Sequence, residues 1–404
     1  MRKGIVGVQF LFVAFGATVL VPLLVGLDPS TALFTAGLGT FIFHLVTKGK
    51  VPIFLGSSFA FIAPIIAASK QWGMPGTLAG IAGVALVYFI MSALIKWQGQ
   101  KLLDRLFPPV VIGPVIILIG LTLSGSAVNM AKGNWILAIV SLATAIMVLT
   151  LGRGLIKLVP VVCGIIVGYT VAICMGVVDF SGIAVAPWFS LPPSINHFHF
   201  PQFAWQPFLY MIPVAIAPVI EHIGDVYVVS AVAGKDFVKD PGLHRTMLGD
   251  GLACLAASLL GGPPVTTYGE VIGAMSITKI TFPQVIRIAA GTAIVFSVIG
   301  KLSAFLHSIP QAVLGGIMLL LFGTIANVGI QNLIQHRVDL SITRNIIIIS
   351  VTLTLGIGGA IFSFGNFSLE GIGLSAVVGI LLNLLLPHNK EEEMESLKKN
   401  INQE

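Results

Sequence analysis

Residues 261–274 read GGPPVTTYGEVIGA, and residues 51–64 read VPIFLGSSFAFIAP. In both stretches, proline or glycine near the start is followed by β-branched and aromatic residues. These favour extended backbone, and only the second half of each stretch suits a helix. Extended backbone is tolerated inside a bilayer only where protein or a cavity surrounds it. Paired interrupted segments of this kind are typical of the binding site of a secondary transporter; two proline-kinked helices without a ligand are the alternative.

The composition of the whole chain indicates a membrane protein. Of its 404 residues, 56% are hydrophobic and 9% are charged, and the mean hydropathy is +1.00. An ordinary soluble domain carries about 25% charged residues. A cytosolic globular enzyme and a disordered protein are therefore excluded, and membrane lipid is the expected surrounding. The net charge of +6 comes from basic residues scattered singly, so we expect no nucleic-acid partner.

Fourteen apolar segments are expected to cross the membrane, seven on each side of a polar, proline-rich stretch at about 178–206. A spanning helix needs about 20 mainly apolar residues. The charged residues 389–404 are expected to form a cytoplasmic tail. The expected segments lie near residues 6–27, 30–47, 51–69, 76–95, 106–124, 134–152, 155–176, 208–233, 244–261, 263–279, 282–302, 309–333, 342–364 and 368–387.

The positions of lysine and arginine support this count. With a cytoplasmic N-terminus, nineteen of them fall in cytoplasmic loops and three in external loops, namely Lys70, Lys132 and Lys301. One missed or extra segment would reverse every later loop and destroy this bias. We therefore expect both termini in the cytoplasm and the loop near Asn196 outside.

Traces of an internal duplication connect the two halves. Because each half has an odd number of segments, a duplicated half must lie inverted in the membrane relative to the first. The sequence thus predicts an all-α polytopic membrane protein with fourteen segments in two inverted seven-segment repeats, and with short strands in segments 3 and 10. The matching positions are Ser57–Ala60 with Thr266–Gly269, and Pro108 and Gly113 with Pro310 and Gly315.

Carboxylates inside the expected segments indicate a polar cavity, because burying an unpaired carboxylate costs several kcal/mol. Glu221 and Asp225 are four residues apart and share one helix face. Glu270 lies where the extended start of segment 10 turns into helix. No basic residue is expected to pair with these acids, and His222 points about 100° away from Glu221 on a helix. Neighbouring carboxylates in such a cavity cannot all ionise cheaply, which suits proton coupling.

The remaining polar residues carry weaker signals. Asp250 is close in sequence to Arg245, so we expect a structural or capping role for it. His197 and His199 in the long external loop are weak evidence for a metal. Gln9 needs a partner, either a helix or a substrate. The three cysteines have no metal-ligand spacing, so we expect neither a metal site nor a cofactor.

Four motifs resemble the nucleobase–ascorbate transporters, also called nucleobase:cation symporter family 2. The resemblance is nearest to the bacterial uracil permeases of the uracil–xanthine permease group, and it runs from about residue 5 to 387. The motifs are EHIGD at 221–225, KDPGLHRTMLGDGLA at 239–253, GGPPVTTYGEVIG at 261–273 and GSSFAF at 56–61.

The resemblance implies a core domain of segments 1–4 and 8–11 and a gate domain of segments 5–7 and 12–14. The core domain would comprise residues 1–100 and 205–305, and the gate domain residues 101–180 and 306–388. It also implies uptake of a nucleobase by proton symport with alternating access, in the cytoplasmic membrane of a bacterium. A homodimer is suggested as well.

The resemblance also implies roles for single residues. Glu221 and Glu270 match the carboxylates that hold the base, and the backbone amides of Phe59 and Gly269 match groups that meet its carbonyls. Tyr268 matches a residue that lines the site. Asp225, Glu221 and Glu270 are the candidates for proton coupling.

Four positions depart from the pattern of the uracil permeases and leave the choice of base open. Asp225 stands where those proteins have histidine, and Val265, Val271 and Phe10 replace polar residues. Xanthine or another purine is therefore the alternative to uracil. Glu270 favours uracil, because xanthine carriers have glutamine there.

Three other functions are weaker matches. An inorganic-anion transporter of the same architecture would want cationic or neutral site residues rather than two glutamates. An intramembrane aspartyl protease is suggested only by the pairs Gly224-Asp225 and Gly249-Asp250, and neither has a second glycine two residues earlier. A channel would differ from a symporter in failing to accumulate substrate against a gradient. We expect a transporter and not an enzyme.

Overall fold

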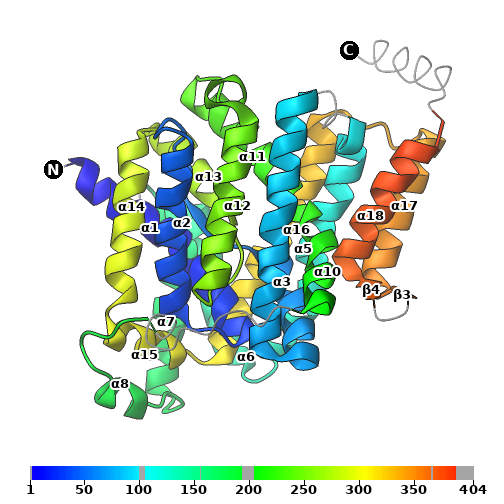
Figure 1. Cartoon of the computed structure of the whole chain (residues 1–404). Helices are drawn as coiled ribbons and strands as arrows, with labels where there is room; N and C mark the ends of the chain where they lie inside the picture. Colours follow the sequence, from blue (N-terminus) through cyan, green and yellow to red (C-terminus); the bar gives the residue numbers. More distant parts are fainter. Residues whose placement is uncertain (1, 100–104, 155, 193–203, 365–366, 388–404) are drawn as a thin grey trace.

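The computed structural model describes residues 2–99, 105–154, 156–192, 204–364 and 367–387 (Figure 1). The expected tail at 389–404 and the residues Asn196, His197 and His199 lie outside the described residues. Within the described part, six helices have the length and hydropathy of a membrane span, and shorter apolar helices of 10–17 residues accompany them.

The helices and strands of the first half follow the expected segments closely. Segments 3 and 4 share one long helix, α3, which is broken at Gly73 (φ 69°, ψ 174°) and followed by Pro75. The elements are α1 (Arg2–Val25), α2 (Pro29–Val46), β1 (Leu55–Ser57), the short helix η1 (Phe59–Phe61), α3 (Ile62–Gln98), α5 (Pro109–Ala131), α6 (Trp135–Leu151), η2 (Ile156–Leu158) and α7 (Pro160–Cys174).

The second half repeats this plan after the short helix α8 (Ser181–Val185). Segment 8 consists of two helices that meet at Ala215, and segment 10 consists of a strand and a helix. The elements are α10 (Trp205–Val214), α11 (Ile216–Ala233), η3 (Val238–Gly242), α12 (Leu243–Leu259), β2 (Val265–Thr267), α13 (Gly269–Thr278), α14 (Pro283–Ser297), α15 (Gly300–His307), α16 (Gln311–Gln335), α17 (Thr343–Ile357), β3 (Ile361–Phe364), β4 (Phe367–Glu370) and α18 (Gly371–Leu385).

Side-chain caps and prolines fix several helix starts. Asp28 accepts hydrogen bonds from the backbone N–H groups of Ser30 (2.8 Å) and Thr31 (3.1 Å) at the start of α2. Asn134 does the same at the start of α6. Proline occupies the first turn of α2, α5, α7 and α14, where its missing N–H leaves no acceptor unpaired. The local sequence thus sets these boundaries.

The predicted extended stretches pair with each other in the interior. β1 and β2 are antiparallel, with Leu55 opposite Thr267 and Ser57 opposite Val265. Two further backbone bonds, Ser58 N to Pro264 O (2.9 Å) and Tyr268 N to Phe54 O (3.2 Å), extend the ladder. Each strand therefore satisfies the other's backbone groups away from lipid, as extended backbone inside a membrane requires.

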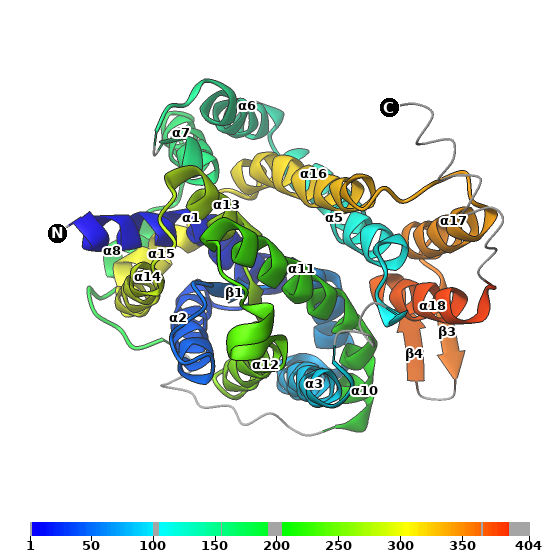
Figure 2. The ribbon, with the colours of Figure 1, turned by 90° about the horizontal axis from the view of Figure 1, so that it is seen from above.

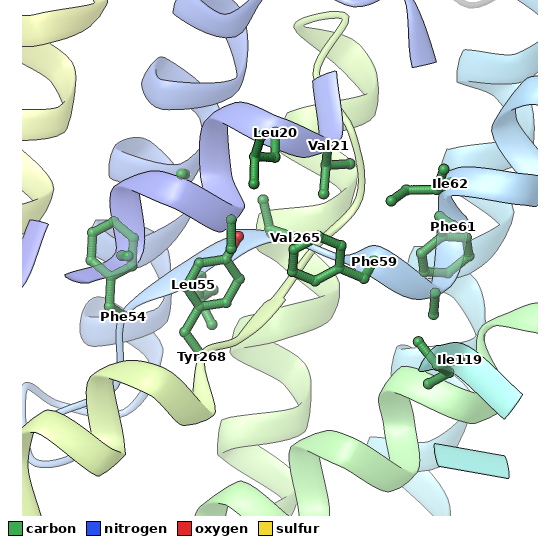
Figure 3. Close-up of a cluster of buried hydrophobic side chains, with 14 of the residues drawn as sticks. Leu20, Val21, Phe54, Leu55, Phe59, Phe61, Ile62, Ile119, Val265 and Tyr268 are labelled. Carbon is green, nitrogen blue, oxygen red and sulfur yellow. The ribbon is translucent and has the colours of Figure 1, made fainter. Parts of the chain in front are cut away.

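A glycine and a tyrosine determine the shape of this strand pair. A Cβ atom at Gly56 would come within 2.3 Å of the Tyr268 ring, so only glycine fits under it. The Tyr268 hydroxyl donates to the Ser57 carbonyl at 2.9 Å. Figure 3 shows the Tyr268 ring beside Leu55 and near Phe54, with Val265 and Phe59 further along the strands. The Tyr268 side chain therefore holds β2 against β1.

The helices form two groups when the molecule is seen from above (Figure 2). In the first, which we call the core group, α12 packs on α2 and α3, α14 packs on α1 and α2, and α10 packs on α3. In the second, the gate group, α16 packs along α5, and α6, α7, α17 and α18 complete the set. α11 contacts both α12 and α5, so it lies where the two groups meet. The predicted domain boundaries themselves stay a prediction.

A strand hairpin corrects the expected ends of the last two segments. Residues 361–364 and 367–370 form the antiparallel pair β3–β4 rather than the end of one helix and the start of the next. Helix α17 ends at Ile357 and α18 begins at Gly371. The hairpin sequence alternates phenylalanine with polar or small residues, which suits strands better than helix. Segment 11 is also shorter than expected, because α14 ends at Ser297 and a separate helix, α15, follows.

One side-chain hydrogen bond connects the two helix groups at the hairpin end. The Tyr210 hydroxyl of α10 donates to the Glu370 carboxylate, which stands at the start of α18, at 2.5 Å. Helix α10 also packs against both α18 and β4. The two groups are therefore in direct contact on this side of the molecule.

Candidate binding site

A small cavity lies beside the β1–β2 pair, between the core group and the gate group. The core group supplies its polar and aromatic lining, and the gate group supplies isoleucine side chains. This mixture of an apolar wall and a few placed polar groups is typical of small-molecule sites. The lining residues are Ser57, Phe59, Ala60, Glu221, Thr266, Tyr268 and Glu270 from the core group and Ile116, Ile119 and Ile325 from the gate group.

Two carboxylates lie on one side of α11, and one of them, Glu221, lines the cavity. Glu221 and Asp225 are both partly exposed, whereas His222 and Val226 beside them are buried. Asp225 Oδ2 accepts a hydrogen bond of 2.6 Å from the Thr267 hydroxyl at the end of β2. The predicted sharing of one helix face is confirmed, and this bond places Asp225 at the end of the strand pair.

Glu270 is held at the start of α13, directly after β2. It is exposed, as is Gly269, while Val271 and Ile272 behind it are buried, so its side chain is on the accessible side of the helix. A Cβ atom at Gly269 would lie 3.4 Å from Asp225 Oδ1. The structure therefore brings Glu221, Asp225 and Glu270, which come from two segments, to the same junction.

Two helices begin at the cavity, one in each repeat. β1 leads into η1 at Phe59, and β2 leads into α13 at Gly269. The first N–H groups of a helix have no acceptor within it, and they favour electron-rich groups. The two strand–helix junctions therefore present the backbone N–H groups of Phe59 and Gly269, the two positions that the resemblance implies; their contact with a base stays a prediction.

The two aromatic residues at the cavity have different surroundings. Phe59 packs edge-on against Phe322 of α16, with ring centroids 5.9 Å apart, so it contacts the gate group. The Tyr268 hydroxyl is held by Ser57, and Thr18 donates to it at 3.4 Å. Tyr268 lines the cavity, but its hydrogen bonds hold the strands together.

Among the described residues, neither lysine nor arginine forms an ion pair with Glu221, Asp225 or Glu270. The carboxylates of Asp225, Glu270 and Asp250 all lie within electrostatic range of Glu221. Ionising all of them together in a region of low dielectric would be expensive, so the cluster favours retention of a proton.

Sequence reasoning missed a buried histidine–aspartate pair behind the cavity. His222 Nδ1 lies 2.8 Å from Asp250 Oδ2, and both side chains are fully buried. Among the described residues the ion-pair partner of Asp250 is His222 rather than the neighbouring Arg245. The sequence shows only that a histidine and an aspartate occur in consecutive segments. The packing of α11 on α12 brings the two side chains together.

Gln9 is not among the cavity residues. Its Oε1 atom is buried and has no hydrogen-bond partner in the part of the chain that the structure describes. The same part contains no group of three histidine, cysteine, aspartate or glutamate side chains arranged to hold a metal ion.

Residues 2–363 match the sequence model of the permease family. The chain belongs to this family. It is 50% identical to a protein named probable uracil permease from Haemophilus influenzae, in an alignment that covers 97% of this chain and 96% of that protein. It is 45% identical to the uracil permease of Bacillus subtilis (96% and 93% covered) and 39% identical to that of Escherichia coli K12 (93% and 89% covered). The resemblance seen in the motifs is confirmed, and the protein is a transporter.

Solved structures of other transporters share the fold of this permease. The transmembrane domain of the cyanobacterial bicarbonate transporter BicA superposes with a TM-score of 0.66 at 16% identity, covering 95% of this chain and 96% of that one. The anion transporter SLC26A9 gives a TM-score of 0.67 at 12% identity, covering 95% of this chain and 64% of that one. The predicted fold of fourteen segments in two inverted repeats is confirmed, and the protein is a multi-pass membrane protein.

Proposed function

We propose that this permease imports uracil together with protons. The observation that carries the proposal is the position of Glu221 and Glu270 at a cavity formed where two strand–helix junctions meet. In the part of the chain that the structure describes, neither carboxylate forms an ion pair. The relatives that are 39–50% identical over nearly the whole chain and are named uracil permeases support the choice of base.

The chemistry of uracil suits this lining. Uracil is flat and neutral, with two N–H donors and two carbonyl acceptors. The carboxylates of Glu221 and Glu270 are strong acceptors for N–H groups. The backbone N–H groups at Phe59 and Gly269 are donors for carbonyl oxygens. The isoleucines of the gate group would cover the remaining surface of the base without competing for hydrogen bonds.

The negative charge of the carboxylates at the site is the reason for proposing proton coupling. Uracil brings no positive charge, so three close carboxylates would remain uncompensated unless a proton accompanies the base. Asp225 is the candidate carrier, because it lies one helical turn from Glu221 and next to Gly269. Movement of the gate group against the core group would then expose the loaded site to one side and then the other.

Competition for uptake tests the choice of base. In cells that express the protein and lack other uracil carriers, unlabelled uracil should displace radiolabelled uracil at lower concentration than xanthine, thymine, guanine or ascorbate does. Stronger displacement by xanthine would favour the purine alternative, which the valines at 265 and 271 leave open. An inorganic anion that displaced uracil would favour the function of the structural relatives instead.

Replacing Phe59 by alanine should weaken uracil binding, but less than the loss of Glu270 does. The backbone donor at residue 59 remains, and the lost ring contributes about 1–3 kcal/mol of packing and stacking. Binding to the purified protein in detergent measures the effect. A loss larger than that of Glu270→Ala would mean that the ring, not the carboxylate, dominates the site.

We also propose that both termini lie in the cytoplasm of a bacterium and that the protein resides in the cytoplasmic membrane. Reporter tags at the two termini should therefore be cytoplasmic, and a tag inserted beside the exposed Asp179, between α7 and α8, should be external. The skew of basic residues supports this orientation. Cytoplasmic labelling at Asp179 would contradict it. The homodimer suggested by the resemblance stays a prediction, which cross-linking in membranes would test.

A further inference from the structure

The His222–Asp250 pair holds a proton in a fixed place. The Thr246 hydroxyl donates to the Leu243 carbonyl at 2.9 Å, so its oxygen is the acceptor in the 3.0 Å contact with His222 Nε2. Nε2 therefore carries a hydrogen. The 2.8 Å contact between Nδ1 and Asp250 Oδ2 then needs a proton between the two atoms, because two lone pairs at that distance would repel. His222 thereby fixes the orientation of the Asp250 carboxyl group.

The other oxygen of Asp250 is free to accept a proton. Asp250 Oδ1 is buried and has no hydrogen-bond partner among the described residues. Two neighbouring oxygens, the Tyr88 hydroxyl and the Thr266 hydroxyl, are buried and likewise lack a hydrogen bond of good geometry in the described part of the chain. Buried polar atoms are rarely left unpaired, so three together need an explanation.

The three oxygens form a series that leads to the cavity. The Tyr88 hydroxyl interacts with both the Asp250 carboxyl group and the Thr266 hydroxyl. Thr266 itself lines the cavity, together with Glu221 and Glu270. The Tyr88 ring also packs edge-on against His222, with centroids 6.3 Å apart, so the tyrosine is fixed beside the pair.

We propose that Asp250, positioned by His222, is an internal proton acceptor that exchanges its proton with the substrate cavity through the hydroxyl groups of Tyr88 and Thr266. The proposal rests on the proposed proton symport. A carboxylic acid in the cavity gives its proton to the Thr266 oxygen, Thr266 passes its own to Tyr88, and Tyr88 passes its own to Asp250 Oδ1. Each hydroxyl ends with one hydrogen, the cavity acid becomes a carboxylate, and Asp250 gains one proton.

The ionisable groups around the pair favour this exchange. Tyr88 faces it from α3, and Cys254 lies one helical turn beyond Asp250 on α12. On the cavity side Glu221, Asp225 and Glu270 supply negative charge. Three nearby carboxylates stabilise an extra proton on the pair when the cavity is empty. The binding of substrate to these carboxylates changes that balance, which would couple the proton to the base.

Two isosteric substitutions test the route. Tyr88→Phe and Thr266→Val each remove one hydroxyl and keep the packing. The matched controls are Tyr169→Phe and Thr352→Val, which remove buried hydroxyls in the gate group. In proteoliposomes without a gradient, Tyr88→Phe should exchange internal for external uracil at the wild-type rate, while the accumulation of Thr266→Val, which changes the cavity lining, is compared with its own exchange rate. Under an inward proton gradient they should lose accumulation, while both controls keep it. Asp250→Asn should behave like Tyr88→Phe.

Normal gradient-driven accumulation by Tyr88→Phe and Thr266→Val would overturn the proposed route and leave the proton symport intact. Loss of exchange together with accumulation in Tyr88→Phe would overturn it too, because that hydroxyl would then serve binding or folding. If the wild-type protein itself does not respond to a proton gradient, the proposed symport fails, and the internal acceptor fails with it.

Discussion

Replacing Glu270 by alanine is expected to weaken uracil binding about 10- to 150-fold while the protein stays folded, because a hydrogen bond to a charged group contributes about 1.5–3 kcal/mol. Glu270 lies in the first turn of α13 on its exposed side, so its removal leaves no cavity in the packed interior. The strand pair behind it is held by Tyr268, Ser57 and the backbone ladder, none of which involves this carboxylate. Equilibrium binding of radiolabelled uracil to purified protein measures the change.

The matched control for this variant is a carboxylate outside the cavity. Asp236→Ala removes an exposed carboxylate between α11 and α12 that pairs only with the exposed Lys239 at 3.3 Å, and it should bind uracil normally. A thermal unfolding midpoint close to that of the wild-type protein would show that Glu270→Ala is folded. Near-normal affinity in a folded Glu270→Ala protein would remove Glu270 from the binding site.

Asp225→Asn is expected to separate binding from coupling. Asparagine keeps an oxygen that can accept the hydrogen bond from the Thr267 hydroxyl, so the junction between β2 and α13 should keep its shape. It cannot take up a proton in the pH range of transport. The variant should therefore bind uracil and exchange it across the membrane, but fail to concentrate it when the outside is acidic.

Proteoliposome uptake with and without an inward proton gradient measures this separation. Thr267→Val is the companion variant: it removes the donor to Asp225 but leaves the titrating group, so accumulation should persist with an altered pH profile. If Asp225→Asn accumulates uracil with the wild-type dependence on external pH, Asp225 is structural. Glu221 or Glu270 must then carry the proton at the cavity.

The sequence predicted the unusual strands because their cause is local. Prolines and glycines followed by β-branched residues disfavour helix wherever they occur, and the repeated pattern indicated that the two stretches occupy matching positions in the two halves. The hairpin β3–β4 was missed for a related reason. Its phenylalanines continue the apolar runs on both sides, so hydropathy alone merges it with the adjoining helices, and only the alternation at 361–370 distinguishes it.

The candidate site was predictable only in part. Spacing alone placed Glu221 and Asp225 on one helix face, and the strand–helix boundary singled out Glu270. The His222–Asp250 pair depends on how α11 packs against α12, and no periodicity in either helix encodes that contact. The same holds for Tyr88, which comes from α3 and contacts the pair only through tertiary packing. Pairs between distant segments are the part of a polar site that one sequence does not reveal.

Uptake of radiolabelled uracil into proteoliposomes containing the purified wild-type protein tests proton-coupled uracil import most directly. With an alkaline interior and an acidic exterior, uracil should rise inside above its external concentration, and a protonophore should return it to equilibrium. Uptake that stops at the external concentration whatever the proton gradient would contradict symport and indicate a channel or a facilitator. Uptake driven by a sodium gradient instead would identify a different coupling ion.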